Sequence, residues 1–244
     1  MELKGSAWLV TGGGTGLGRE IALLAARGGA DVAVNYSRSQ AEAEATAAEA
    51  RALGVRAAAV RGDVAAESEA VVAAAVGALG RLDVLVNNAG TTVFVPFRDL
   101  DAISEADWDR IFAVNVKAAF LCSRAAAARM PEGGAILNVA SVAGLRPTGS
   151  SLPYSVSKAA LIHLTQGLAV ALAPRVRVNG VAPGLLDTRW SAGHSREFIE
   201  GANRRSLLGH IPSLADTAAA AVALCLNESV TGQVLPVDSG ATLH

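Results

Sequence analysis

A tyrosine and a lysine stand four residues apart in the stretch YSVSK, which spans residues 154–158. Four residues make about one helical turn, so on a helix the side chains of Tyr154 and Lys158 would lie on one face. An ammonium group beside a phenol favours the phenolate and lowers the pKa of the phenol from its usual value of about 10. The pair is therefore a candidate proton donor and acceptor. An ordinary exposed tyrosine and lysine would have the same spacing, so the rest of the chain must decide.

Short runs rich in β-branched residues alternate with longer alanine-rich runs along the whole chain. Helix-like runs end at Gly29, Gly54 and Gly80, where a glycine can take the positive φ that closes a helix. This alternation predicts parallel strands joined by crossovers, with helices on both faces of the sheet. We therefore expect an α/β protein of the Rossmann-like, doubly wound class, with a mostly parallel, seven-stranded sheet in a single domain over residues 1–244. The strand-like runs are SAWLVTG, DVAVNY, RAAAVRGD, DVLVNNAG, GAILNVAS, RVRVNGVAPG and QVLPVD, and the helix-like runs lie near 16–28, 39–53, 66–79, 104–129, 154–172 and 214–226.

The composition narrows the function classes. Of the 244 residues 51% are hydrophobic, which supports one buried core, and the net charge of −1 favours neither nucleic acid nor an anionic membrane surface as a partner. Cys122 and Cys225 both fall in apolar helix-like runs, so we expect buried free thiols rather than a disulfide. The four histidines lack metal-ligand spacing, so we expect no catalytic metal. The first residues contain too short an apolar run for a signal peptide, and no uninterrupted apolar run of about 18 residues follows, so we expect a cytoplasmic protein without a membrane segment.

A glycine-rich turn, LVTGGGTGLGRE, follows the first strand-like run and opens the first helix-like run. Gly12, Gly16 and Gly18 have the spacing G-x-x-x-G-x-G, which differs from the commoner G-x-G-x-x-G. Glycines at such a turn let a pyrophosphate approach the backbone and meet the N–H groups at the start of the helix. The turn is not a P-loop, because no Gly-Lys-Ser/Thr follows. It predicts a dinucleotide site.

The end of the second strand-like run indicates which dinucleotide binds. An NAD site places an acid there to bind the ribose 2′-hydroxyl, but the only nearby acid, Asp31, begins the strand. The carboxyl end carries Ser37 and Arg38 instead, and an arginine with a hydroxyl can bind a 2′-phosphate. We therefore expect NADP(H) to be preferred, with NAD(H) as the alternative, since Arg38 could also be a solvated residue at the start of a helix.

Polar and turn-forming residues gather at the carboxyl ends of the other strand-like runs, where the ligands of such sheets bind. They are Asp63, Asn87, Asn88, Ser141, Pro183 and Gly184, and Tyr154 and Lys158 begin the helix-like run after Ser141. With these residues in one crevice, the chain resembles the short-chain dehydrogenase/reductase family, in the subgroup similar to 3-oxoacyl-(acyl-carrier-protein) reductases. The resemblance covers residues 6 to about 240 and is carried by TGGGTGLG, DV at 63–64, NNAG at 87–90, the asparagine of FAVNVKAAF, Ser141 placed 13 residues before Tyr154, YSVSK and PGLLDT.

The resemblance implies a role for each matching residue. Tyr154 is expected to be the general acid in reduction and the base in oxidation, and Ser141 to hydrogen-bond and orient the substrate carbonyl. Lys158 is expected to bind the nicotinamide ribose and to lower the pKa of Tyr154, an effect to which the charge of the oxidised nicotinamide adds. Asn115 is expected to hold a water that links Lys158 to solvent. The expected cofactor-binding residues are Gly12, Gly14, Thr15, Gly16, Leu17 and Gly18 at the glycine turn, Ser37 and Arg38 at the 2′-phosphate, Asp63 and Val64 at the adenine, Asn87, Ala89 and Gly90 on the adenosine side, Tyr154 and Lys158, and Pro183, Gly184, Leu186 and Thr188 around the carboxamide.

Residues 186–211 stand where a substrate lid is expected. The stretch from Arg189 to His210 matches no motif of the family and contains the basic and aromatic residues Trp190, His194, Arg196, Arg204, Arg205 and His210. These residues could meet a carboxylate, a phosphate or a carrier-protein substrate; alternatively the stretch is a solvated loop, because Glu197 and Glu200 lie in the same run. Two further departures from the family are the short connection ALAPRVRVN and Ser239, which stands where a second glycine is common.

The sequence leaves the substrate open. A partly apolar pocket could form from Thr91 to Phe94, Val142, Leu145, Leu185 and Trp190. It would suit a 3-oxoacyl thioester or a hydrophobic ketone, without excluding a steroid, a sugar or a quinone-like ring. We expect an NADP(H)-dependent oxidoreductase of carbonyls or secondary alcohols; the alternatives are an NAD-dependent alcohol dehydrogenase and a non-catalytic nucleotide-sensing relative. No G-x-S-x-G elbow occurs, which disfavours a hydrolase. The resemblance also implies a homo-oligomer, a tetramer or a dimer, packed through the helices at 104–129 and 154–172 and the C-terminal region.

Overall fold

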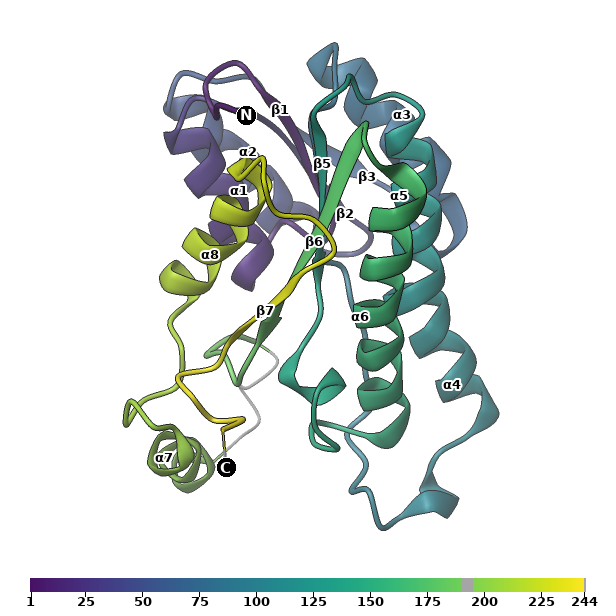
Figure 1. Cartoon of the computed structure of the whole chain (residues 1–244), viewed down its shortest axis with the longest axis vertical. Helices are drawn as coiled ribbons and strands as arrows, with labels where there is room; N and C mark the ends of the chain where they lie inside the picture. The colour runs from purple at the N-terminus through teal and green to yellow at the C-terminus, as the bar shows by residue number, and fades with distance from the viewer. Residues whose placement is uncertain (190–194, 244) are drawn as a thin grey trace.

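The computed structural model describes residues 1–189 and 195–243, which fold around one parallel sheet (Figure 1). The strands are β1 (Ala7–Val10), β2 (Asp31–Tyr36), β3 (Ala57–Arg61), β4 (Val84–Asn87), β5 (Gly134–Val139), β6 (Val176–Pro183) and β7 (Val234–Val237). They lie in the order β3-β2-β1-β4-β5-β6-β7, and each pair of neighbours is parallel. The strand order reverses between β1 and β4, and this is the place where a doubly wound sheet binds its ligand. The predicted Rossmann-like sheet of seven strands is confirmed.

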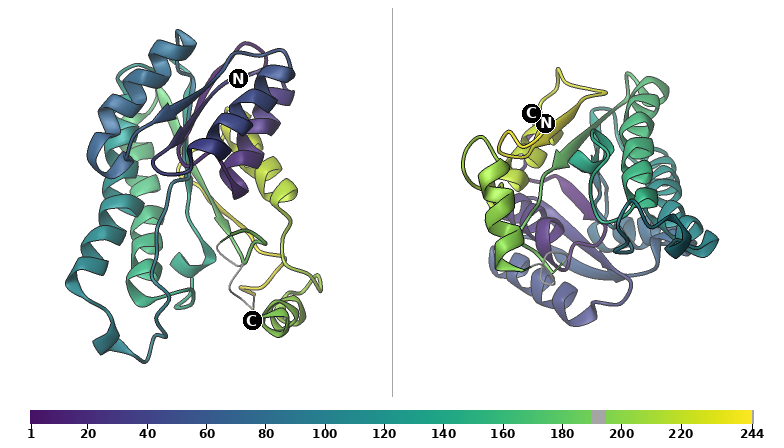
Figure 2. Two further views of the ribbon diagram at one scale, coloured as in Figure 1. Left: turned by 180° about the vertical axis from the view of Figure 1, so that it is seen from behind. Right: turned by 90° about the horizontal axis from the view of Figure 1, so that it is seen from below.

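Helices cover both faces of the sheet, as both views of Figure 2 show. Trp8 and Val10 pack in the core with α1 and α8, whereas Ala7 and Leu9 pack in the opposite core with α3 and α5, because alternate residues of a strand point to opposite faces. One layer contains α1 (Gly16–Arg27), α2 (Gln40–Ala52) and α8 (Leu214–Leu226), and the other contains α3 (Val64–Leu79), α4 (Glu105–Phe112), α5 (Ala118–Ala127) and α6 (Leu152–Leu172).

The predicted helix at 104–129 is interrupted. A π-helical turn, η2 (Ala113–Lys117), separates α4 from α5, and its extra residue shifts the side chains that follow it. Asn115 lies inside this turn and is buried, which places its amide toward α6 rather than toward solvent. Two short 3₁₀ turns, η1 (Leu100–Ala102) and η3 (Val142–Gly144), also lie near the carboxyl ends of the strands.

The expected lid contains a helix. The alternative of a plain solvated loop over residues 189–210 is wrong for Arg196–Arg205, which form α7. The Ser195 hydroxyl caps this helix by accepting the N–H of Phe198 at 3.2 Å. Trp190 and His194 lie outside the described residues. The segment after α7 packs on the C-terminal turn, because the Leu208 N–H donates to the Ser239 carbonyl at 3.2 Å.

Two expectations about apolar stretches bear on Cys122, Cys225 and α6. Cys122 and Cys225 are buried free thiols, as predicted. No uninterrupted apolar run is found in α6, because polar residues such as Lys158 and Gln166 interrupt it, although by length and mean composition α6 could cross a membrane. In the fold α6 is a core helix that packs on β6, η3 and α4.

Candidate active site

Tyr154 and Ser141 come together at the carboxyl end of β5. The Ser151 hydroxyl caps α6 by accepting the Tyr154 N–H at 3.4 Å, which places Tyr154 in the first turn of the helix. Ser141 follows β5 and begins η3, where its hydroxyl accepts the Ala143 N–H at 3.1 Å. The side chains of Ser141 and Tyr154 form a hydrogen bond. The predicted approach of these two side chains is therefore present in the structure.

Lys158 lies one turn further along α6, on the same face as Tyr154. Its Nζ lies 5.7 Å from the centroid of the Tyr154 ring and donates to the Val139 carbonyl at 2.7 Å. Burial lowers the pKa of Lys158 to about 8. For the protein chain alone, burial raises the pKa of Tyr154 to about 12, against a smaller lowering by the Ser141 hydrogen bond.

The expectation that Lys158 lowers the pKa of Tyr154 is thus wrong for the protein chain alone. Burial dominates because it disfavours both the phenolate and the ammonium, and the ammonium is directed to a backbone carbonyl instead of to the phenol oxygen.

Asn115 connects the π-helical turn to both sides of the site. Its Oδ1 accepts the Thr91 N–H at 2.8 Å, and its Nδ2 donates to the Thr91 carbonyl and to Ser157 Oγ, each at 3.0 Å. Ser157 in turn donates to the Tyr154 carbonyl at 2.7 Å. A single amide therefore fixes the backbone after β4 against the first turn of α6.

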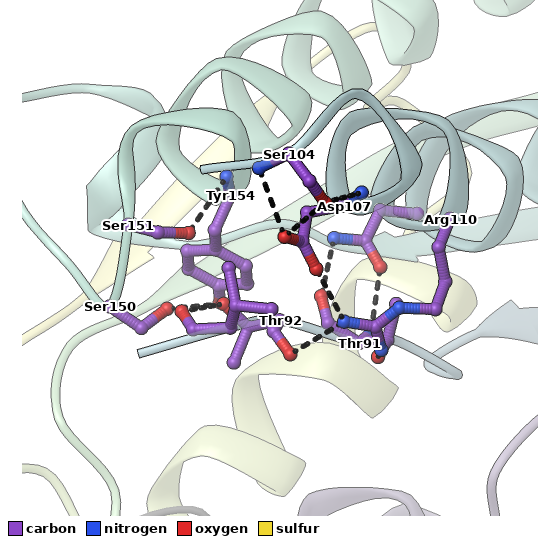
Figure 3. A network of polar contacts seen from close by, with 10 residues as sticks. Thr91, Thr92, Ser104, Asp107, Arg110, Ser150, Ser151 and Tyr154 are labelled. Atoms are coloured by element: carbon purple, nitrogen blue, oxygen red, sulfur yellow. Dashed lines mark hydrogen bonds and ion pairs between the residues drawn. The ribbon is translucent and has the colours of Figure 1, made fainter. Parts of the chain in front are cut away.

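A second set of polar contacts surrounds Tyr154 and reaches the surface (Figure 3). Arg110 donates to Thr91 Oγ1 at 2.9 Å and lies 3.4 Å from Asp107. The hydroxyls of Thr92 and Ser150 lie 2.6 Å apart, and the neighbouring Gly149 packs on the Tyr154 ring, where an added Cβ would lie 3.4 Å from Cδ1. Two loops thus meet beside the Tyr154 phenol.

The glycine turn has the geometry of a phosphate cradle. Gly12 and Gly16 have φ of +62° and +54°, values that a side chain would strain. A Cβ on Gly18 would lie 2.7 Å from the Gly12 carbonyl oxygen, so only glycine lets the helix approach this closely. Thr15 forms no capping hydrogen bond, and the first turn of α1 contains no acidic residue. The turn therefore presents positive N–H groups that suit a pyrophosphate.

Other predicted nucleotide contacts lie around this turn. Asn88 donates to the carbonyls of Thr11 and Gly12 at 2.9 and 3.1 Å, which ties the end of β4 to the turn. Thr188 lies beside the glycine turn, because a Cβ on Gly16 would lie 3.4 Å from Thr188 Cγ2.

The predicted residues differ in what their side chains can contact. The Asp63 carboxylate caps α3 by accepting the Ala65 N–H at 2.9 Å, and the side chain of Val64 is buried in the core. Asn87 is buried and donates to Asn138 Oδ1 at 2.9 Å, which supports the centre of the sheet. Leu186 packs against the core from its edge. Ser37 and Arg38 are exposed at the carboxyl end of β2, and Gly184 follows β6 and packs on Asp238.

Three residues around the predicted site were missed in the sequence. Ser157 stands inside YSVSK, so its position was visible but its contact with Asn115 depends on the π-helical turn. Glu42 and Arg189 lie 147 residues apart and pair at 2.6 Å, a contact without a local pattern. Among residues 1–189 and 195–243, no group of His, Cys, Asp and Glu could hold a metal ion.

The comparisons with known proteins agree with this geometry. Residues 6–197 match the family described as short chain dehydrogenase. The chain is 38% identical to the L-rhamnose 1-dehydrogenase (NAD(P)(+)) of Sphingomonas sp. over 98% of this chain and 96% of that protein. It is 37% identical to the 3-oxoacyl-(acyl-carrier-protein) reductase of Staphylococcus aureus, over 98% of this chain and 99% of that protein. The crystal structure of a short chain dehydrogenase from Burkholderia cenocepacia in complex with NADP has a TM-score of 0.91 and 37% identity, over 99% of both chains.

The chain belongs to the short-chain dehydrogenase/reductase family. It is an oxidoreductase of carbonyls and alcohols that uses a nicotinamide dinucleotide, and within the family it resembles the 3-oxoacyl-(acyl-carrier-protein) reductases.

Proposed function

We propose that the protein is an NADP(H)-dependent oxidoreductase in which Tyr154 exchanges a proton with the oxygen of a carbonyl or secondary alcohol. The observation that carries the proposal is the hydrogen bond between the Tyr154 and Ser141 side chains, with Lys158 Nζ at 5.7 Å from the phenol ring. A nucleotide-sensing protein would not need these three groups together. The glycine turn and these three groups both lie at the carboxyl ends of strands of one parallel sheet, and this supports chemistry on a dinucleotide bound along that edge.

The roles divide by position. In reduction Tyr154 donates its hydroxyl proton to the carbonyl oxygen, which becomes the alcohol, and Ser141 orients that oxygen by a hydrogen bond. The dinucleotide, when bound, supplies the hydride in reduction and accepts it in oxidation. Lys158 would bind the nicotinamide ribose, and Asn115 would keep a solvent path to Lys158. The glycine-turn residues, with Pro183, Gly184, Leu186 and Thr188, would hold the pyrophosphate and the carboxamide.

The proposed preference for NADP(H) depends on Ser37 and Arg38. Both are exposed beyond β2, where the adenosine ribose of a doubly wound protein lies. Asp31 cannot take the place of the ribose acid, since it begins β2 and binds Arg56 at 2.6 Å. The dissociation constants of NADPH and NADH, measured by titration calorimetry, test this preference; tighter binding of NADH would contradict it.

The proposed substrate is a carbonyl attached to an apolar group, such as a 3-oxoacyl thioester or a hydrophobic ketone. Leu145 and Phe94 are exposed near the loops that meet at Tyr154, and the 3-oxoacyl reductase relative supports the thioester. The named sugar dehydrogenase supports a polar alternative, which the paired hydroxyls of Thr92 and Ser150 could bind.

A panel of carbonyl compounds, followed by the loss of NADPH absorbance, separates these substrates. Tyr154→Phe should remove most turnover with the best of them, by about 100-fold or more, because it deletes the proton donor. Its NADPH dissociation constant should change less than about threefold, which serves as the control for an intact fold. Wild-type turnover in Tyr154→Phe would contradict the proposed role.

We also propose a cytoplasmic homo-oligomer, a dimer or a tetramer. Exposed apolar side chains on α5, α6 and the C-terminal region support it, because such residues mark protein interfaces; they are Phe120, Val156, Val170, Leu235 and Leu243. Val170 is 83% exposed. Light scattering gives the number of subunits of the wild type and of Val170→Lys, and the variant should have fewer if Val170 lies in the subunit interface. A monomeric wild type would contradict the proposed oligomer.

A further inference from the structure

Arg189 reaches from the segment after β6 to the starts of α1 and α2. Its Nη1 lies 2.6 Å from Glu42 Oε1, and its Nη2 donates to Thr15 Oγ1 at 2.9 Å. Thr15 is the N-cap of α1, and Glu42 lies in the first turn of α2. The guanidinium group therefore joins three segments that surround the glycine turn.

The contacts of neighbouring residues place this guanidinium beside the glycine turn. A Cβ on Gly14 would lie 3.0 Å from the Ala43 nitrogen, so the start of α2 packs directly on the turn. Ser37 and Arg38 form the connection that leads into α2 at Ser39. The corner between Thr15, Arg38 and Glu42 is where the ribose 2′-phosphate of NADP(H) would lie under the proposed function.

Arg189 neutralises the negative charge of Glu42 at this corner. Hydrogen bonds from its own backbone N–H and from Arg189 hold the pKa of Glu42 below its usual range, so its carboxylate is ionised at neutral pH. An ionised carboxylate would repel a phosphate, and the guanidinium neutralises it. A guanidinium has five N–H donors in a planar fork, and the contacts with Glu42 and Thr15 engage two of its nitrogens. It can therefore hold a phosphate oxygen while it remains paired with Glu42.

We propose that Arg189 binds the 2′-phosphate of NADP(H) together with Arg38, and that Glu42 holds the Arg189 guanidinium in place. The proposal rests on the proposed NADP(H) preference. It makes Arg189, which lies at the start of the expected lid, a second determinant of cofactor choice beside Arg38.

Binding of nucleotide fragments tests the proposal without turnover. Adenosine 2′,5′-bisphosphate and 5′-AMP differ only in the 2′-phosphate, and titration calorimetry gives their dissociation constants. Arg189→Ala should weaken binding of the bisphosphate by about tenfold to a hundredfold, which is typical of a lost charged hydrogen bond. The dissociation constant of 5′-AMP should stay within about twofold of the wild-type value. Adding Glu42→Gln to Arg189→Ala should restore part of the loss, since the exposed carboxylate then no longer repels the phosphate.

Control variants separate this proposal from the general cofactor preference. Arg196→Ala removes the same charge from α7, where Arg196 pairs only with Glu200 among the contacts that the structure gives it, and should leave both constants unchanged. If Arg38→Ala weakens the bisphosphate and Arg189→Ala does not, at equal melting temperatures, the role of Arg189 is overturned and the NADP(H) preference stands. If the wild type binds both fragments equally, the preference and the role of Arg189 both fall.

Discussion

Gly144 sets the distance between the Ser141 turn and α6, so its replacement by alanine should separate the two proton-transfer side chains. A Cβ on Gly144 would lie 2.6 Å from the Lys158 carbonyl carbon and 2.7 Å from the Ala159 nitrogen, whereas ordinary contact begins at 3.4 Å. These are backbone atoms of α6, which no side-chain rotation can move away. Relieving the overlap therefore requires η3 and α6 to separate by roughly 1 Å.

The expected losses of stability and of activity follow from this shift. Overpacking of this kind costs about 1–3 kcal/mol of folding free energy. A displacement of roughly 1 Å between reacting groups costs about 100-fold in rate. The bond from Ser155 Oγ to the Ala143 carbonyl, now 2.7 Å, crosses the same contact and would lengthen. We expect kcat to fall about 100-fold and NADPH affinity to fall much less, because the shift reaches Lys158 but leaves the glycine turn untouched.

The assay is steady-state reduction of the best carbonyl substrate at saturating NADPH, with melting temperature and NADPH binding measured on the same sample. Gly77→Ala is the matched control, because among the described residues a Cβ there meets no atom within 4 Å. It should keep wild-type kcat and gain about 0.5–1 kcal/mol of stability from helix propensity. Wild-type kcat in folded Gly144→Ala would refute the reasoning that this contact positions Ser141 against Tyr154.

Three further variants test other features. Ser239 has a φ of 55°, which strains a residue with a side chain, so Ser239→Gly should raise the free energy of unfolding by up to about 1 kcal/mol. Urea denaturation measures this, and a lower free energy of unfolding would show that the backbone at Ser239 is not strained. Lys158→Met should raise the free energy of unfolding most below pH 8, where the folded wild type still buries an ammonium. As the pH rises from about 8 toward 10.5 the wild type becomes more stable, so the advantage of Lys158→Met should shrink by about 3 kcal/mol. A difference in urea midpoints that stays constant with pH would contradict this. Gly18→Ala should weaken NADPH binding at least about tenfold by calorimetry, since its Cβ overlaps the Gly12 carbonyl; unchanged affinity would show that the turn adapts.

The sheet and its chemistry could be predicted because their signals are local. Strand-helix alternation gives the parallel order, and the carboxyl ends of parallel strands meet at one edge, so Ser141 and Tyr154 converge although they are 13 residues apart. The π-helical turn at Asn115 could not be predicted, because it depends on one extra residue in an otherwise helical pattern. For the protein chain alone the pKa of Tyr154 is raised rather than lowered, because spacing reveals a neighbouring charge but not the burial that opposes it.

The way in which Asn115, Tyr154 and Lys158 are held explains why the substrate could not be predicted. Asn115 binds both backbone groups of Thr91, Ser157 binds the Tyr154 carbonyl, and Lys158 binds the Val139 carbonyl. Backbone partners persist when side chains change, so these contacts do not constrain the neighbouring loop side chains.

The loop side chains beside Tyr154 can therefore change without disturbing its phenol. Thr92, Ser150 and Leu145 contact this region through side-chain atoms or exposed surface, and each could be exchanged while the backbone bonds stay in place. We therefore expect substrate choice to depend on these loop side chains rather than on the motifs. A double substitution of Thr92 and Ser150 by valine and alanine should accordingly shift the ranking of polar and apolar carbonyls while NADPH affinity is kept; an unchanged ranking across the panel would contradict this separation.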